Sequence, residues 1–343
     1  MEEFLKKYQQ RPVVEYPNDV SSNPLVSVSV MTYQHVNYIQ QCLDGILMQK
    51  TNFPVEILVG EDGSTDGTRE LCVDYAKKYP DRIRLFLHHR ENNIKINGIP
   101  TGRFNYLYNL FSSRGKYVAF CEGDDYWTHP GKLQRQVDFL ENNPDYGMVS
   151  TDVELIDQAG QQLEENPMVS QQRKNRKPEV SFYDLLNVNH VNTCTTCIRK
   201  HLIKSLADRV IRESLGFVFD YWYWLNISLA SKIGIFYEKT SAYRVHEGGL
   251  SRQQNFLSFN RPLVQYDVMR KYLNVVDRQE FKSHSDVILK GILSLIRNQR
   301  ISFFLKIKLM ALLFQKFRLL PEMLHASAKM ARKCCLRMPE KLS

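Results

Sequence analysis

The feature that most constrains the fold is a regular alternation of short strand-like runs with longer amphipathic segments between residues 24 and 144. Each run has the length of a strand, and each segment that follows places its apolar residues at helical spacing. The runs are LVSVSVMTY, VEILVG, RIRLFLHH and KYVAFC, and the segments are VNYIQQCLDGILMQ, TRELCVDYAKKYPD and TGRFNYLYNLFSSRG. This alternation predicts an α/β fold: a Rossmann-like, mostly parallel sheet flanked by helices, with functional loops at the carboxyl ends of the strands.

Beyond Pro144 the pattern becomes irregular. The stretches YGMVSTDVELID, VNTCTTCIRK and GIFYEKTSAYRVH favour strands, whereas SFYDLLN and the aromatic segment FDYWYWLNISLAS favour helices. The polar, charged and Pro-bearing stretch 157–180 is typical of a mobile surface loop. From about Asn255 onward the pattern is helical, so we expect a C-terminal helical extension.

The positive charge of the chain is concentrated in its last part. The sequence carries a net charge of +9, and residues 301–343 contain nine Lys or Arg against two acidic residues, a local net charge of +7. This distribution argues against nucleic acid as a partner and favours a tail that meets an anionic surface. Peripheral contact with the inner face of the cytoplasmic membrane is one interpretation. Packing of these helices on the main domain, or a homo-oligomer contact, is the alternative.

The sequence also bears on the cellular compartment. No stretch is long and apolar enough to predict a membrane span, and the N-terminal MEEFLKKYQQRPVVEYP lacks the apolar run of a signal peptide. We therefore expect a cytoplasmic protein whose seven cysteines are reduced. Cys194 and Cys197 form a CxxC pair with no second pair, so small buried side chains are favoured over a zinc or redox site.

Three carboxylates, those of Glu61, Asp62 and Asp66, lie in the turn after the second predicted strand, within VGEDGSTDGTRE. Asp66 is placed to cap the helix that begins near Thr68, and Ser64 and Thr65 are ordinary turn residues. Asp62 follows the strand directly, where it could accept a hydrogen bond from a ligand N–H. On these residues alone, an acidic turn and a ligand-binding carboxylate are both open.

A second acidic group, AFCEGDDYW, follows the fourth predicted strand and contains Glu122, Asp124 and Asp125. Carboxylates this close repel one another unless a cation compensates them, and Mg²⁺ and Mn²⁺ prefer oxygen ligands. A cap for the following helix explains one acid, with Asp125 the candidate, so we favour a metal site. Neither GxGxxG nor GxxxxGK[ST] occurs, which argues against dinucleotide redox chemistry and P-loop phosphate binding.

Five motifs occur in order along the chain: VSVSVMTYQHVNYIQQCLDGILMQ, ILVGEDGSTDGT, GKYVAFCEGDDYWTHPGKLQRQVDFLENNP, FDYW and YRVHEGGLS. Together they resemble the inverting glycosyltransferases of the large bacterial family 2, which have the GT-A fold. The resemblance covers roughly residues 24–254. We therefore expect an N-terminal segment over 1–23, a GT-A catalytic domain over 24–254 and a basic helical C-terminal region over 255–343.

The resemblance implies roles for residues that bind the nucleotide-sugar donor. The family usually has Pro-Thr-Tyr-Asn where this chain has Met31-Thr32-Tyr33-Gln34, and Tyr33 matches the tyrosine that packs on the nucleobase. Asp62 matches the carboxylate that accepts the uracil N3–H. The other nucleotide-sugar-binding candidates implied by the family pattern are Thr32, Arg103, Asn105, Glu122, Gly123 and Arg244.

The resemblance also implies a divalent cation, Mn²⁺ or Mg²⁺. Asp124 matches the metal ligand of the family's Asp-x-Asp motif, which appears here as Glu122-Gly123-Asp124. His246, in YRVHEGGLS, matches a histidine that reaches the metal or the diphosphate.

Inverting transfer needs a general base that deprotonates the acceptor hydroxyl. In the family this base is an acid at the start of a helix, and GFVFDYWYWL places Asp220 there. A helix-capping carboxylate is the structural alternative. The aromatic run Tyr221–Trp224 favours a sugar-stacking platform, with some of its members in the core.

Together these features predict a metal-dependent glycosyltransferase that moves a sugar from a UDP-sugar to a glycan or lipid-linked glycan acceptor with inversion. The resemblance implies a place in bacterial cell-surface polysaccharide biosynthesis, such as that of lipopolysaccharide. A sugar nucleotidyltransferase is one alternative, although MTYQHVNY lacks the Gly-rich basic loop that such an enzyme needs. A catalytically inactive glycan-binding or scaffold subunit is the other.

Overall fold

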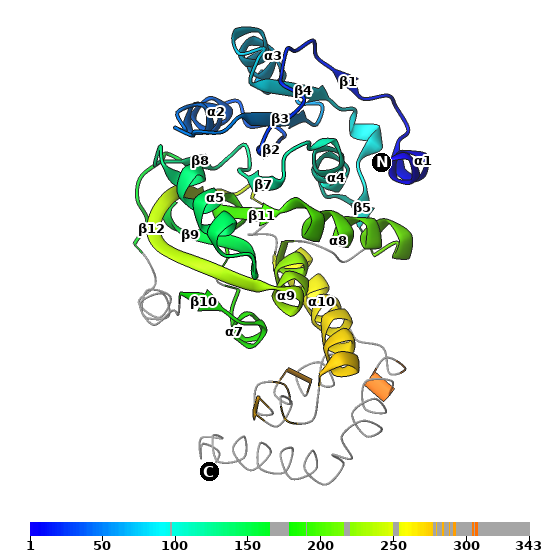
Figure 1. Ribbon diagram of the computed structural model, residues 1–343. Coiled ribbons are helices and arrows are strands. Elements are labelled where there is room, and N and C mark those ends of the chain that lie inside the picture. The colour runs from blue at the N-terminus through cyan, green and yellow to red at the C-terminus, as the bar shows by residue number, and fades with distance from the viewer. Residues whose placement is uncertain are drawn as a thin grey trace, which may run out of the picture. The chain divides into compact units, whose positions relative to one another are not determined.

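The computed structural model describes residues 1–96, 98–164, 178–189, 191–215, 220–249 and 254–276, with isolated residues beyond (Figure 1). Packing divides the chain into two units, residues 1–185 with 189–252, and residues 186–188 with 253–343. All the site residues predicted above belong to the first unit. The predicted basic tail, 301–343, falls outside the described residues apart from Phe304, Lys306 and Ile307. No helix in the described ranges has the length and apolar character needed to cross a membrane.

The first unit is built on a mixed sheet with the strand order β1-β4-β3-β2-β7-β11-β9-β12-β10, and β8 pairs with β12. The strands β2, β3, β4 and β7 run parallel, and β11 is inserted antiparallel between β7 and β9. The strands are β1 (Val14–Glu15), β2 (Val26–Thr32), β3 (Val55–Glu61), β4 (Ile83–Leu87), β7 (Tyr117–Phe120), β8 (Tyr126–Trp127), β9 (Tyr146–Ile156), β10 (Glu179–Val180), β11 (Thr196–Arg199) and β12 (Lys232–Arg244).

Helices follow the parallel strands as the sequence predicts. The helices are α1 (Glu2–Tyr8), α2 (Ile39–Leu47), α3 (Thr68–Lys78), α4 (Arg103–Ser112), α5 (Lys132–Asn142), α7 (Phe182–Asn187), α8 (Lys200–Glu213), α9 (Asp220–Ala230) and α10 (Gln254–Val275). A short hairpin, β5 (Lys95–Ile96) and β6 (Ile99–Pro100), and two 3-10 turns, Arg90–Asn92 and Thr193–Thr195, complete the described elements. Within the stretch 157–180 predicted as a loop, β10 forms near the end, and residues 165–177 lie outside the described ranges.

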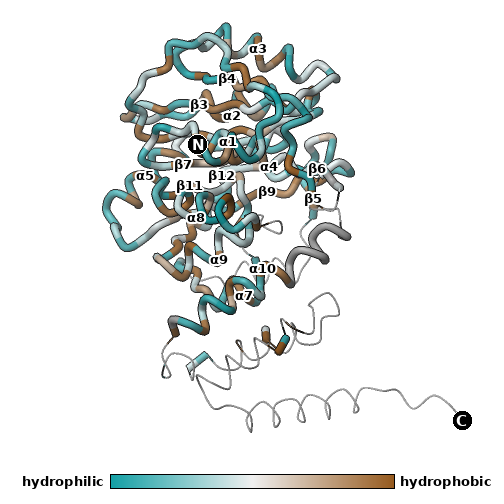
Figure 2. Tube along the Cα trace, turned by 90° about the vertical axis from the view of Figure 1, so that its right-hand side faces the viewer, coloured by the Kyte–Doolittle hydropathy of each residue, from teal (hydrophilic) through white to brown (hydrophobic). Residues whose placement is uncertain are grey.

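The core lies around the parallel strands. Every residue of β3 is buried, and both α3 and α4 pack against this strand. A strand covered on both faces is mostly hydrophobic, and the one charged residue within VEILVG, Glu56, is buried in an ion pair with Arg84. Figure 2 shows the hydrophobic residues along β3 and β4, whereas the outer helix α3 alternates between hydrophilic and hydrophobic residues.

The register of the parallel strands fixes where their following loops meet. Thr32 pairs with Glu61, and Glu61 pairs with Leu87, so β2, β3 and β4 end at the same level. The strand β7 lies beside β2 and also runs parallel to it. The loops after these four strands therefore share one edge of the sheet, which is where an open α/β sheet binds its ligands.

Candidate active site

Asp62 lies at this edge with one carboxylate oxygen engaged and one available. The residue is 3% exposed. Its Oδ2 accepts a hydrogen bond from Asn93 Nδ2 at 2.8 Å and forms an ion pair with Arg90. No described residue donates a hydrogen bond to its Oδ1. Burial raises the pKa of Asp62 to about 6, against the opposing effect of Arg90. The carboxylate is thus oriented through one oxygen and can accept an N–H from a ligand through the other.

Tyr33 presents an aromatic surface next to this carboxylate. Its side chain is exposed, and the Arg90 guanidinium lies 3.8 Å from the centre of its ring. Because Arg90 also pairs with Asp62, it links the predicted stacking residue to the predicted hydrogen-bond acceptor. A flat ring beside a buried acceptor has the chemistry that recognises a nucleobase.

The other two carboxylates of the turn have structural partners. Glu61 is fully buried, accepts the Ser64 N–H at 2.6 Å and forms an ion pair with Arg69. Asp66 accepts hydrogen bonds from the N–H of Thr68 at 3.0 Å and from its hydroxyl at 2.6 Å. Thr68 is the first residue of α3. The capping position itself is Gly67, one residue beyond the predicted cap. Of the three acids, Asp62 is therefore the one placed to contact a ligand.

Asp124 lies between two imidazoles. Its Oδ2 is 2.9 Å from His246 Nε2 and 4.0 Å from His35 Nε2, and 20% of its side chain is exposed. Burial alone would raise the pKa of Asp124, but the hydrogen bond from His246 and the nearby imidazoles lower it. A carboxylate with a neighbouring imidazole is a donor set suited to Mn²⁺, and substrate phosphates normally complete such a site. Among the described residues no group of three or more His, Cys, Asp or Glu is arranged as a complete metal site.

Glu122 lies near both Asp124 and the predicted base, Asp220. Its Oε2 is buried without a hydrogen-bond partner, and burial together with the charges of Asp124 and Asp220 raises its pKa. Asp220 begins α9, where it accepts hydrogen bonds from Thr193 Oγ1 at 3.1 Å and from the Tyr221 N–H at 2.6 Å. Burial also raises the pKa of Asp220. Glu122 is thus within electrostatic reach of both Asp124 and Asp220.

Two predictions from the sequence are wrong. Asp125 does not cap the following helix, because α5 begins at Lys132 after Gly131; it is instead buried and accepts the Arg244 N–H at 2.8 Å. The run Tyr221–Trp224 does not form an exposed platform, because all four side chains are buried. A helix that is hydrophobic on all sides packs into the core, and this property explains the second error.

Arg244 holds several loops together at this edge. Its guanidinium donates to Asp124 O at 2.9 Å, to Asp157 O at 3.2 Å and to Gln41 Oε1 at 2.9 Å. It also lies 4.6 Å from the centre of the Tyr38 ring. The structure therefore places Arg244 behind Asp124, where it supports the loop that carries the predicted metal ligand.

Thr32 and Gly123 pack against each other beside His35. A side chain at Gly123 would approach Thr32 Oγ1 to 2.7 Å and His35 Nδ1 to 2.8 Å. The Gly123 N–H also donates to Met31 O at 2.9 Å. Glycine therefore allows the Glu122–Asp124 turn to lie directly on the end of β2.

Arg103 and Asn105 lie at the start of α4. Arg103 Nη2 donates to Leu215 O at 2.9 Å, and burial lowers the Arg103 pKa. Asn105 is 2% exposed and donates to Gly60 O at 2.6 Å, while its Oδ1 has no partner. Both residues are near the Asp62 turn, and their predicted contact with nucleotide phosphates stays a prediction.

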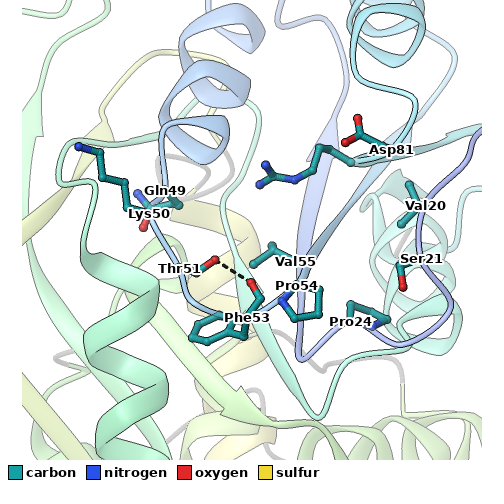
Figure 3. Close-up of a pocket in the computed structure, with 11 residues that line it drawn as sticks. Val20, Ser21, Pro24, Gln49, Lys50, Thr51, Phe53, Pro54, Val55 and Asp81 are labelled. Atoms are coloured by element: carbon teal, nitrogen blue, oxygen red, sulfur yellow. Dashed lines mark hydrogen bonds between the residues drawn. The ribbon is translucent and has the colours of Figure 1, made fainter.

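A cavity of ≈ 500 Å³ lies at the opposite edge of the sheet, before β2, β3 and β4 (Figure 3). Pro24, Val55 and Asp81 line it, and the Thr51 hydroxyl donates to Phe53 O at 2.8 Å within its wall. None of the predicted site residues contributes to this cavity. It is therefore separate from the carboxyl edge of the sheet.

Sequence reasoning missed Arg90, Asn93, His35 and Thr193. They come from loops or turns, where no periodicity marks a residue for attention. His35 had a usable signal, because it follows a predicted strand within two residues of Tyr33. Arg90 follows the third predicted strand in the same way. Both residues therefore lie at the carboxyl edge of the sheet, as the other candidates do.

Relatives with a similar sequence match about two thirds of this chain. An uncharacterized protein of Mycobacterium tuberculosis is 31% identical over 225 residues, which are 66% of this chain and 60% of that protein. An uncharacterized glycosyltransferase of Rickettsia typhi is 29% identical over 227 residues, which are 66% of this chain and 65% of that protein. The match thus spans less than two thirds of the length of these relatives.

Solved structures with a similar fold have low sequence identity. Staphylococcus aureus TarS 1–349 in complex with UDP has a TM-score of 0.53 and 18% identity, covering 81% of this chain and 74% of that one. The mannosyltransferase PcManGT of Pyrobaculum calidifontis, in complex with GDP-Man and Mn²⁺, has a TM-score of 0.51 and 18% identity, covering 98% and 86%. These similarities confirm the predicted GT-A fold. The profile of Glycosyl transferase family 2 matches residues 27–206, more than half of the 343 residues, and the chain therefore belongs to that family.

Proposed function

We propose that this chain transfers a sugar from a UDP-sugar to a hydroxyl group of a glycan acceptor, with inversion at the anomeric carbon. One observation carries the proposal: Asp124 and Asp220 are both within electrostatic reach of Glu122, at the sheet edge that also holds Asp62. A donor-side carboxylate and a candidate base therefore both lie near Glu122.

The donor side is formed by Tyr33, Asp62 and the pair Asp124–His246. Tyr33 offers a face for the nucleobase, and Asp62 Oδ1 accepts its N3–H. Asp124 and His246 would hold Mn²⁺ or Mg²⁺, which supplies positive charge that stabilises a diphosphate leaving group. The ligands bound in two solved structures of similar fold, UDP in TarS and GDP-Man with Mn²⁺ in PcManGT, support a nucleotide-sugar donor.

The acceptor side depends on Asp220. Its burial raises its pKa, which makes the carboxylate a stronger base for the acceptor hydroxyl. Thr193 Oγ1 and the Tyr221 N–H hold the two carboxylate oxygens, so the side chain has a fixed orientation. A single in-line displacement with Asp220 taking the proton inverts the anomeric centre.

The acceptor that we propose is a bacterial surface glycan or its lipid-linked precursor, met at the inner face of the cytoplasmic membrane. The support is the net charge of +7 over residues 301–343, which favours an anionic lipid surface. Membrane fractionation of the full chain at low and high salt tests this part separately: a chain that stays in solution at low salt contradicts it.

The test of the enzyme proposal compares UDP binding with sugar transfer in matched variants. Asp220→Asn should bind UDP normally and lose about 10²–10⁴-fold in kcat. Asp62→Asn should weaken UDP binding roughly tenfold to a hundredfold, because it removes a charged hydrogen-bond acceptor. Asp74→Asn, which changes an exposed carboxylate on α3, is the control and should change neither quantity.

The alternatives give different results in this experiment. A wild-type chain that binds UDP but never transfers or hydrolyses a sugar from any nucleotide sugar is a binding subunit. A chain that releases pyrophosphate from UTP and a sugar phosphate is a nucleotidyltransferase. Either result contradicts the proposed transfer reaction.

A further inference from the structure

We propose that residues 1–16, here called the N-terminal strap, position residues of the nucleotide site. The strap holds the loop 88–93 in the position from which Arg90 and Asn93 orient Asp62. The strap lies outside residues 27–206, the part of the chain that matches the family. This inference rests on the proposed function for two assignments, the recognition of the nucleobase by Asp62 and of the diphosphate by Asp124 and His246.

Asn92 joins the loop to the strap. Its side chain is buried, with the residue 2% exposed. Its Oδ1 accepts the N–H groups of Gln10 and Arg11 at 2.7 Å and 2.8 Å, and its Nδ2 donates to Arg11 O at 2.9 Å. The amide thus binds the strap backbone through three hydrogen bonds, and it does so in a buried place where unsatisfied partners would be costly.

The next residue, Asn93, joins the same loop to the nucleotide site. Asn93 Nδ2 donates to Asp62 Oδ2 at 2.8 Å. Its Oδ1 accepts the N–H groups of Thr101 and Gly102 at 2.9 Å and 3.2 Å, just before α4. Two consecutive asparagines therefore bind different partners, one the strap and the other the carboxylate that we assign to the nucleobase.

The strap itself is fixed on both sides of Gln10 and Arg11. On one side, Phe4 of α1 is buried and lies 4.9 Å from Phe104 of α4, ring centre to ring centre, and Figure 1 shows α1 beside α4. On the other side, β1 pairs antiparallel with β4 through Val14 and Leu87. The part of the strap backbone that Asn92 binds is therefore held in place on both sides.

Lys7 adds a second anchor for α1. Its Nζ donates to Ile211 O at 2.5 Å and to Ser214 Oγ at 2.6 Å, at the end of α8. Arg103 Nη2 donates to Leu215 O, the carbonyl of the residue after Ser214. The strap, the end of α8 and the start of α4 are thus connected at the side of the site where Asp62 lies.

This arrangement makes the strap a positioning element. A loop that is ordered before the ligand arrives does not lose its conformational freedom on binding, so its affinity for the ligand is higher. The gain in affinity comes from contacts made through Asp62, which recognise the base. Contacts to the diphosphate depend on Asp124 and His246, which the strap does not touch.

The test measures binding of UDP and of inorganic pyrophosphate, both with Mn²⁺, by isothermal titration calorimetry. Asn92→Ala should weaken UDP binding about tenfold or more, as loss of a positioning contact does, and should leave pyrophosphate binding unchanged. Asn143→Ala, which removes a side-chain hydrogen bond to Phe139 O at the end of α5, is the matched control and should change neither affinity. Equal UDP affinity in a folded Asn92→Ala variant overturns the proposal, as does an equal loss for both ligands.

A second variant tests the strap without touching the loop. Phe4→Ala should release α1, and hydrogen exchange should then be faster at the amides of residues 88–93, with weaker UDP binding. If α1 amides exchange faster while the loop and the UDP affinity stay as in wild type, the strap has no positioning role. If wild type does not bind UDP, or binds it as well after Asp62→Asn, the proposed function fails first. The two failures are therefore distinguishable.

Discussion

The ion pair between Arg69 and Glu61 leads to a quantitative prediction about the turn that carries Asp62. Glu61 is fully buried, whereas the Arg69 side chain is 31% exposed. Glu61 also accepts the Ser64 N–H at 2.6 Å, and Arg69 Nη2 donates to His88 O at 2.7 Å. The pair therefore closes the turn after β3 and ties it to the end of β4.

The two partners should not be equivalent on substitution. Arg69→Met leaves a carboxylate buried without its cation, which costs about 3–5 kcal/mol in free energy of unfolding. Glu61→Gln keeps an oxygen that can accept the Ser64 N–H, and water can solvate the partly exposed Arg69, so we expect a loss of about 1–2 kcal/mol. The double variant leaves no buried charge and should be more stable than Arg69→Met alone.

Urea unfolding at pH 7, followed by circular dichroism, measures these differences for the three variants and wild type. Lys77→Met, which removes an exposed ion pair with Asp74 on the same helix, is the control and should change the free energy of unfolding by less than about 0.5 kcal/mol. The reasoning is refuted if Arg69→Met is no less stable than Glu61→Gln. It is also refuted if the losses of the two single variants simply add in the double variant.

Two further predictions concern the same edge of the sheet. Burial raises the pKa of Asp62 to about 6, so the carboxyl becomes protonated as the pH falls through 6 and UDP affinity should fall with it. Asp62→Asn should lack this part of the pH dependence in calorimetry, and a parallel profile for both proteins argues against base recognition by Asp62. Gly60→Ala would place a methyl group 1.7 Å from Asn105 Oδ1 and 3.0 Å from Asn109 Oδ1, and overpacking of this kind costs about 1–3 kcal/mol. Adding Asn105→Ala should recover part of the loss in thermal unfolding, and no recovery would mean that the clash is not the cause.

The parallel half of the sheet could be predicted because its signals are local. β2, β3 and β4 are short runs rich in Val, Ile and Leu, and each is followed by a helix with apolar residues at helical spacing. The antiparallel strand β11 was predicted as a strand, but its place between β7 and β9 depends on pairing between distant residues. Two-residue strands such as β1 and β8 carry no periodicity at all, and their pairing with β4 and β12 is visible only in the structure.

The candidate site divides in a similar way. Asp62, Asp124 and Asp220 can be identified from the sequence because each belongs to a motif and follows a strand or begins a helix. Arg90 and Asn93 belong to no motif. They matter because they contact Asp62, which is distant from them in sequence. A sequence pattern identifies the residues that a family uses, but it does not identify the neighbours that orient them.

The turn after β3 shows why partners, rather than residue type, decide which acid binds a ligand. Glu61, Asp62 and Asp66 have the same chemistry and lie within six residues. Glu61 uses both oxygens in bonds to Ser64 and Arg69, and Asp66 uses both in bonds to Thr68 and Val36. In Asp62, by contrast, only Oδ2 accepts hydrogen bonds from described residues. Its Oδ1 can therefore still accept one. Asp62 therefore has one oxygen for a ligand N–H, whereas both oxygens of Glu61 and of Asp66 already accept hydrogen bonds.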